Sequence, residues 1–201
     1  MSAVRQDSLL SVAACSAALA CSLLSASAGA QGINIATSYR YASDEARVIE
    51  LHYRGGMVSV SPSITISGDG LMVARLYEPD GHRRLLRTYE LQLSAEELAG
   101  MLDRAVAAGL MEFDADLIAQ RVQALSRPPT RVTDAPTVEI RLRLEDYSTA
   151  AGLSGPRTAV VALVAADLQA RDFPEIRELR GVRDLERTVN ALLKRAMEVQ
   201  R

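Results

Sequence analysis

Histidine, the side chain whose ordinary pKa best suits acid–base chemistry near neutral pH, is scarce in this chain. Histidine is the most frequent general base in proteins, and the sequence contains two, His52 and His82. His52 lies on the polar side of an alternating segment, and His82 directly follows the Pro79–Gly81 turn, where polar residues are expected whatever the function. Neither forms a recognisable pair with a nucleophile or a carboxylate. The sequence therefore predicts surface or cross-strand roles for both histidines.

Three carboxylates cluster within a short segment, at Glu112, Asp114 and Asp116. Such a group can attract a hard cation, or supply the acid and base of a hydrolase, if the fold makes it converge in a pocket. The simpler alternative is that these residues lie in solvent or cap a short helix after Met111. We keep a carboxylate-based hydrolase as an alternative function, with this group as its basis.

Other catalytic and metal-binding patterns are missing from the sequence. The nearest approach to a G-x-S-x-G nucleophile elbow is Gly152–Gly155, which falls in a predicted loop. No H-E-x-x-H or calcium-loop motif occurs, and the two cysteines, Cys15 and Cys21, both lie near the N-terminus. Two histidines without cysteine do not make up a typical zinc site. We therefore predict no cofactor, no metal site and no catalytic residue.

The first thirty residues have the pattern of an export signal. No charged residue occurs from Ser8 to Tyr39, and the apolar centre runs from Leu9 to Leu24. Ala28–Ala30 then gives the small-x-small pattern after which signal peptidase cuts, and Ala26–Ala28 offers a second such site. Cleavage after Ala30 is preferred, so the mature chain is expected to begin at Gln31. The protein is accordingly predicted to be exported, to the periplasm or out of the cell.

Two alternatives to cleavage after Ala30 remain open. The apolar segment could be retained as a membrane anchor, although Ser and Gly interrupt it after Leu24 and a spanning helix needs about 20 apolar residues. Alternatively, Val12–Cys15 resembles a bacterial lipobox, in which Cys15 would be acylated to anchor a lipoprotein that acts in envelope assembly. If the leader is removed, both cysteines leave with it. The mature chain then has no disulfide, cysteine nucleophile or thiolate metal site.

Composition narrows the range of binding partners. The chain has 201 residues, of which 23 are basic and 25 acidic, so its formal net charge is −2. This balance does not favour nucleic acid or an anionic membrane surface. Tryptophan is absent, and two Phe and six Tyr are too few for a broad platform on which bases or sugars would stack. The partner is expected to be a protein or a small molecule, of unknown identity.

Hydrophobic alternation predicts strands, and helical periodicity predicts two main helices. The segment Arg47–Tyr53 alternates apolar and polar residues, and Gly68–Gly70 separates two β-rich runs as a hairpin turn. Ser94 and Glu97 form a capping-box pattern that starts a helix, which Gly109 ends. The predicted strands are 47–53, 63–67, 71–76, 84–93, 137–144 and 158–165, and the last helix is 184–199.

The element order ββββ-α-ββ-α has no βαβ alternation. The predicted fold is therefore α+β, an antiparallel sheet of about six strands with two main helices packed on one face. In this scheme residues 1–30 are the signal peptide, 31–46 a flexible lead-in and 47–201 a single globular domain. The segment 111–122 is predicted to add a short helix, and 126–136 and 147–156 to be loops.

The plan from Ile49 to Leu193 resembles that of an uncharacterised family of exported bacterial proteins. The shared features are an apolar strand, the Gly55–Gly56 turn, an ITISGDG-type hairpin, the capped helix Ser94–Gly109 and the loop Thr133–Pro136. That family has no established activity. The resemblance therefore implies an exported α+β protein and assigns no catalytic residue.

Two surfaces are candidates for partner binding. One is the uncovered side of the sheet, since a sheet covered on one side only has a solvated face. This side is predicted to carry Glu50, His52, Glu139, Arg141 and Arg143. The other is the loop with Arg127, Pro128, Pro129 and Arg131, because prolines pre-order an exposed segment and lower the entropy cost of docking. The leading hypothesis is a small exported binding protein of the bacterial envelope, without catalysis, that uses these two surfaces.

Overall fold

The structure is a computed structural model that describes residues 31–34, 37–56, 60–78, 84–128, 130 and 132–200. The predicted signal peptide, with Ala28, Ala30 and Cys15, lies outside these residues. His82, Pro129 and Arg131 lie outside them as well. No helix within the described ranges is long and apolar enough to cross a bilayer.

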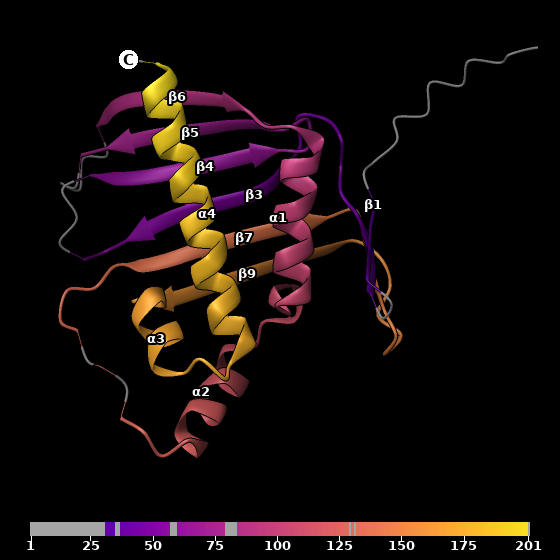
Figure 1. Cartoon of the computed structure of the whole chain (residues 1–201), viewed down its shortest axis with the longest axis vertical. Coiled ribbons are helices and arrows are strands. Elements are labelled where there is room, and N and C mark those ends of the chain that lie inside the picture. The colour runs from indigo at the N-terminus through magenta and orange to yellow at the C-terminus, as the bar shows by residue number, and fades with distance from the viewer. Residues whose placement is uncertain are drawn as a thin grey trace, which may run out of the picture.

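Six antiparallel strands form the main sheet, in the spatial order β6-β5-β4-β3-β7-β9 (Figure 1). They are β3 (Arg47–Arg54), β4 (Ser61–Ser67), β5 (Leu71–Tyr77), β6 (Leu85–Gln92), β7 (Thr137–Leu144) and β9 (Arg157–Val164). Strands β3 to β6 pair in chain order, as short connections between antiparallel strands require. The predicted α+β class and antiparallel sheet are confirmed.

The β4–β5 hairpin fixes the chain that leads into β3. Gly70 in its turn has a φ of 86°, a conformation that glycine adopts without strain. A Cβ added at Gly68 would lie 1.6 Å from the carbonyl oxygen of Ala42, because the turn packs directly against this incoming segment. The Gly68 amide also donates to the carbonyl of Ala46 at 2.9 Å. The glycines are therefore required by both the turn and its packing.

Two main helices, α1 (Ala95–Ala107) and α4 (Arg177–Val199), cover one face of this sheet (Figure 1). The predicted capping box is present: Ser94 Oγ accepts from the Glu97 amide at 3.1 Å, and Glu97 Oε2 accepts from the Ser94 amide at 2.8 Å. Arg195 Nη1 of α4 lies 2.6 Å from Glu97 Oε1, so the same carboxylate also links the two helices.

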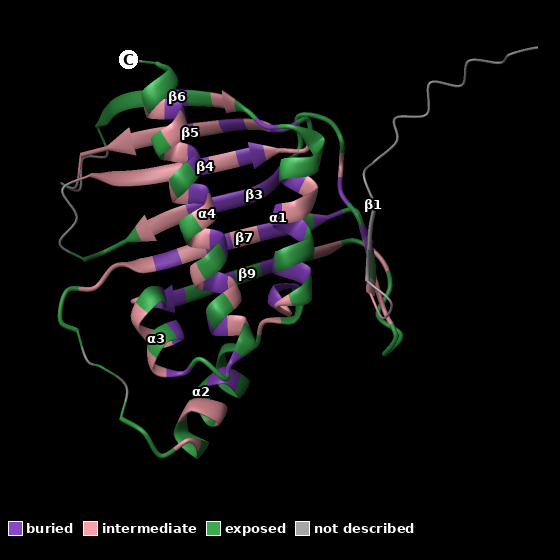
Figure 2. Ribbon diagram, viewed as in Figure 1, coloured by how far each residue is buried: buried purple, intermediate pink, exposed green. Residues whose placement is uncertain are grey.

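Helix α4 is longer than predicted, since it begins at Arg177 rather than near residue 184. Leu179 and Val182 are fully buried and extend its apolar stripe towards the N-terminus. Leu179 and Val182 continue the spacing of Leu185 and Val189, so this extension follows the same helical period as the predicted part of the helix. The stripe packs on the sheet and on α1, as the buried positions along α4 in Figure 2 show.

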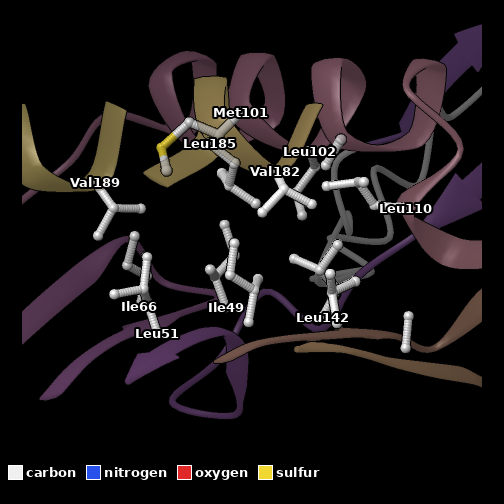
Figure 3. Packing of buried hydrophobic residues seen from close by; sticks show 14 of the residues in the cluster. Ile49, Leu51, Ile66, Met101, Leu102, Leu110, Leu142, Val182, Leu185 and Val189 are labelled. Carbon is white, nitrogen blue, oxygen red and sulfur yellow. The ribbon is translucent and has the colours of Figure 1, made fainter. Parts of the chain in front are cut away.

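The core lies between the helices and the covered face of the sheet. Figure 3 shows Ile49, Leu51 and Leu142 of the sheet pointing towards Val182 and Leu185 of α4. Burying each such side chain stabilises the fold by about 1.5–3 kcal/mol. This buried core is the main source of stability among the described residues, and a chain of this length is long enough to build one.

The prediction of a flexible lead-in is corrected by a second, three-stranded sheet. It consists of β1 (Gln31–Asn34), β2 (Thr37–Arg40) and β8 (Asp146–Thr149), in the order β1-β2-β8. Tyr39 and Tyr41 are 4% and 2% exposed, and Tyr39 Oη donates to Asp103 Oδ1 of α1 at 2.8 Å. These two aromatic side chains anchor a segment whose polar composition alone suggested disorder. Strand β8 likewise occupies part of the predicted 147–156 loop.

Three short helices lie at one end of the sheet. They are the 3-10 helix η1 (Leu110–Glu112), α2 (Ala115–Ala124) and α3 (Ala166–Asp172). The first two replace the single short helix predicted within 111–122. The segment between α2 and β7 contains Pro128 and Pro136. Its described residues form no helix or strand, as predicted.

Candidate functional site

The face of the main sheet opposite α1 and α4 carries polar and charged side chains. Its residues follow from the strand register, in which Glu50 of β3 pairs with Thr65 of β4 and with Arg141 of β7. We call this surface the open face. Its members near the centre of the sheet are Ser63, Thr65, Val73, Arg75, Glu50, His52, Arg54, Glu139, Arg141 and Arg143. Most are half-buried or exposed, so the face is accessible to solvent.

A buried carboxylate with four basic neighbours lies at the centre of the open face. We call Glu50, Arg47, His52, Arg141 and Arg143 the Glu50 cluster. Arg143 Nη2 lies 3.1 Å and Arg141 Nη1 3.9 Å from Glu50 Oε1. Arg47 Nη1 lies 3.5 Å and His52 Nε2 3.8 Å from the other oxygen, Oε2. Strands β3 and β7 therefore direct their basic side chains towards a single acidic group.

Burial of Glu50 contradicts the prediction that its side chain faces solvent. The residue is 4% exposed. Strand β3 is an inner strand of the sheet, and the long arginine side chains beside Glu50 shield it from water. The neighbours Arg141 and Arg143 keep side-chain exposures of 37% and 44%, so their prediction as solvent-facing residues is correct.

The charges of the Glu50 cluster do not cancel. Three guanidinium groups face one carboxylate, which leaves an excess of two positive charges before His52 is counted. Glu50 Oε1 accepts no hydrogen bond from a described residue, so its contact with Arg143 is an ion pair of poor hydrogen-bond direction. A buried carboxylate is stable only when its desolvation is offset by such partners. Glu50 is thus the shared partner of three arginines whose own side chains remain partly exposed to solvent.

A second ion pair adjoins the cluster. Arg54 Nη2 lies 2.7 Å from Glu139 Oε2, and Glu139 is the cross-strand neighbour of His52. This pair is balanced in charge. On strands β3 and β7 the excess positive charge is therefore concentrated around Glu50.

The structure does not bring the proline loop together with His52. Arg127 stacks over the ring of Phe173 at 5.6 Å and pairs with Glu175, close to the end of α3. The amide of Thr130 donates to Asp172 Oδ2 at 2.8 Å. This part of the loop is tied to the α3–α4 connection. Among the described residues no hydrogen bond or ion pair joins it to the Glu50 cluster.

The three clustered carboxylates do not converge, and Glu112 and Asp114 have separate partners. Glu112 accepts a hydrogen bond from Tyr147 Oη at 2.7 Å, and burial of the phenol together with this bond raises the pKa of Tyr147. Asp114 caps α2, with Oδ1 accepting from the amides of Asp116 and Leu117 at 2.9 and 3.0 Å. All three carboxylates are in exposed residues. This geometry lacks the concave site that a carboxylate-based hydrolase requires.

One polar network lies on the covered side of β3 and was missed by the sequence analysis. Tyr53 Oη donates to Glu186 Oε1 at 2.8 Å and accepts from Asn190 Nδ2 at 2.7 Å. Burial raises the pKa of Tyr53 and also that of Glu186. The network links β3 to α4 beneath the sheet, and its groups satisfy one another, as buried polar side chains must. Alternation of apolar and polar residues places Tyr53 on the covered face. No local sequence pattern, however, indicates that its hydrogen-bond partners are Glu186 and Asn190 of α4.

Neither a metal-ligand cluster nor a comparison with known proteins assigns a function to the described residues. Within the described part of the chain, no three His, Cys, Asp or Glu side chains are grouped so as to hold a metal ion. Comparisons of the chain with models of protein families, with curated proteins and with solved structures found no match.

Proposed function

We propose that the protein is an exported, non-catalytic binding protein of the bacterial envelope, and that its open face binds an acidic partner. The observation that carries this proposal is the Glu50 cluster. It places three half-exposed arginines on an uncovered sheet face in a chain whose overall charge is slightly negative. A localised positive field steers and orients an acidic partner even when the net charge of the protein is near zero.

The chemistry of the cluster favours carboxylates on the partner. Arginine presents planar N–H groups that match a carboxylate in a two-pronged geometry. The cluster lies in the middle of the sheet, so the distances between its arginines are set by the pairing of strands β3 and β7. We infer that the partner is a protein with an acidic segment. The export signal supports a location in the periplasm or outside the cell.

The binding proposal can be tested with a defined acidic probe. Isothermal titration of the protein with poly-L-glutamate should show binding that weakens as salt concentration rises. Arg141→Gln and Arg143→Gln should each weaken it about fivefold, the equivalent of about 1 kcal/mol for one exposed ion pair. Lys194→Gln makes the same charge change on an exposed position of α4 and should leave binding unchanged. Equal weakening in all three variants would mean that net charge, and not the open face, governs binding.

A further inference from the structure

A hollow on the other side of the molecule lies between α1 and α4. Its volume is about 380 Å³, which falls within the range of about 300–1,000 Å³ typical of small-molecule pockets. The apolar part of its lining includes Met101, Ala105 and Leu185. Met101 and Leu185 lie next to each other where the two helices meet above the core (Figure 3).

The hollow stays open because the helices are already in close contact beside it. A Cβ added at Gly181 of α4 would lie only 2.3 Å from the Cβ of Ala108. The backbones therefore cannot approach further at this point. Ala105 and Ala107 of α1 also line the space, and their short side chains do not fill it.

The rim of the hollow is strongly basic. Arg104 of α1 and Arg177 and Arg180 of α4 line it, against one acidic residue, Asp184. Asp184 is neutralised by Arg183, whose Nη2 lies 2.9 Å from its Oδ1.

The basic charge on the rim is mostly not compensated. Arg177 has a weak contact, with its Nε 3.7 Å from Glu178 Oε1, and Glu178 is held more closely by Arg121, at 2.9 Å. The guanidinium groups of Arg104 and Arg180 make no hydrogen bond or ion pair with a described residue, although both backbones are hydrogen-bonded within or at the ends of their helices. The first turn of α4, which begins at Arg177 without a side-chain cap, adds the positive end of a helix dipole to the same side.

We propose that this hollow is a binding site for a small organic anion, a molecule with an apolar body and one acidic group. The apolar lining would take the body of the ligand, and Arg104 and Arg180 would bind its carboxylate or sulfonate. The complementarity of charge favours an anion over a neutral molecule of the same shape. The site is separate from the open face and does not depend on the function proposed for it.

A matched pair of fluorescent probes tests this site. 8-Anilinonaphthalene-1-sulfonate and N-phenyl-1-naphthylamine share an apolar body, but only the first carries a negative charge. Fluorescence titration of the full protein at pH 7 should show one saturable site for the sulfonate and binding of the neutral probe at least tenfold weaker. Arg104→Gln and Arg180→Gln should each weaken sulfonate binding about fivefold.

Two further variants separate this hollow from other apolar surfaces. Ala107 is exposed and lines the hollow, so Ala107→Phe should fill the space and abolish saturable binding. Lys194→Gln, on the same helix as Arg180 but outside the hollow, should have no effect. Circular dichroism and thermal unfolding check that each variant is folded. The proposal is overturned if no saturable sulfonate binding occurs, if folded Ala107→Phe binds normally, or if the neutral probe binds as tightly as the sulfonate.

Discussion

At the scale of single residues, Glu50 stands out because it is the one polar or charged residue classed as buried in the described part of the chain. It is 4% exposed and faces three arginines and a histidine on the open face. The arginine and histidine side chains around it are themselves partly exposed, so solvent screens each of their interactions with Glu50. The carboxylate therefore acts by arranging the arginines more than by adding stability.

Replacing Glu50 should nonetheless destabilise the fold. Glu50→Gln leaves three guanidinium groups close together without their shared acidic partner. Removing one partner of a fully buried ion pair costs about 3–5 kcal/mol, and the exposure of the arginines reduces the expected loss here to about 1–2 kcal/mol. Urea unfolding measures this loss. Glu139→Gln is the control, because Glu139 has one exposed arginine partner, and its expected loss is about 0.5 kcal/mol.

Glu186 should give the stability of the protein a measurable pH dependence. Burial raises its pKa above the ordinary value of 4.5, with Asp167 adding to the shift and Tyr53 and Arg187 opposing it. The folded protein therefore binds this proton more tightly than the unfolded chain does. The resulting stabilisation is complete below pH 4.5 and is lost as pH rises through the folded-state pKa.

The comparison with Glu186→Gln isolates this effect. Between pH 4.5 and pH 7 the natural protein should lose free energy of unfolding relative to the variant, which cannot ionise at this position. Glu97 should give the opposite pH dependence of stability, because its hydrogen bond with Arg195 lowers the pKa of its carboxyl group. Relative to Glu97→Gln, the natural protein should lose stability as pH falls. Urea unfolding at a series of pH values measures both, and parallel curves for Glu186→Gln and the natural protein would contradict the account.

At the scale of elements, the contact between α1 and α4 depends on Gly181. Alanine is normally a better helix former than glycine, by about 1 kcal/mol. At Gly181 the added methyl group would lie 2.3 Å from the Cβ of Ala108, so the helices would have to separate. We expect Gly181→Ala to destabilise the protein by about 1–3 kcal/mol, as overpacking does.

A second substitution and a control make this prediction specific. Adding Ala108→Gly to Gly181→Ala removes the clashing methyl group and should recover part of the loss. Gly100→Ala on α1 meets only the flexible guanidinium of Arg104, at 3.5 Å, and should stabilise the protein by about 0.5–1 kcal/mol. Thermal and urea unfolding measure the change in unfolding free energy for Gly181→Ala, for the double variant and for Gly100→Ala. A stabilising Gly181→Ala would show that the two helices are not in the close contact described.

Local sequence patterns predicted most of the main elements correctly. Alternation in β7 and the Ser94 capping box act within a few residues of chain, so they could be recognised without knowing the fold. The start of α4 also has a local pattern, because Leu179 and Val182 are in phase with Leu185 and Val189, but the prediction began the helix too late. Strand β2 could not be recognised in this way, because its position depends on burial of Tyr39 against distant elements.

The candidate site was only partly predictable for the same reason. His52, Arg141 and Arg143 were assigned to the correct face by alternation. Burial of Glu50 depends on arginines from two strands, and the hollow between α1 and α4 depends on how two helices distant in sequence pack. Neither arrangement can be inferred from the spacing of residues along the chain.

At the scale of the whole molecule, the main sheet has one covered and one charged face, and the N-terminal segment that precedes it is predicted from the sequence to be an export signal. Export predicts that intact-mass measurement of protein recovered from the envelope of its host will give a chain that begins at Gln31. A mass increased by a lipid on a chain beginning at Cys15 would instead indicate an anchored lipoprotein. A full-length mass would indicate that the leader is retained.

The central claim is that the open face binds an acidic partner in the envelope, and site-specific photocrosslinking in the host tests it most directly. A photoreactive amino acid at Thr65, which pairs with Glu50 across the sheet, should crosslink to an acidic segment of an exported protein. The same amino acid at the exposed Lys194 of α4 should not give this product. Absence of a crosslink from Thr65, or the same product from both positions, would contradict the account.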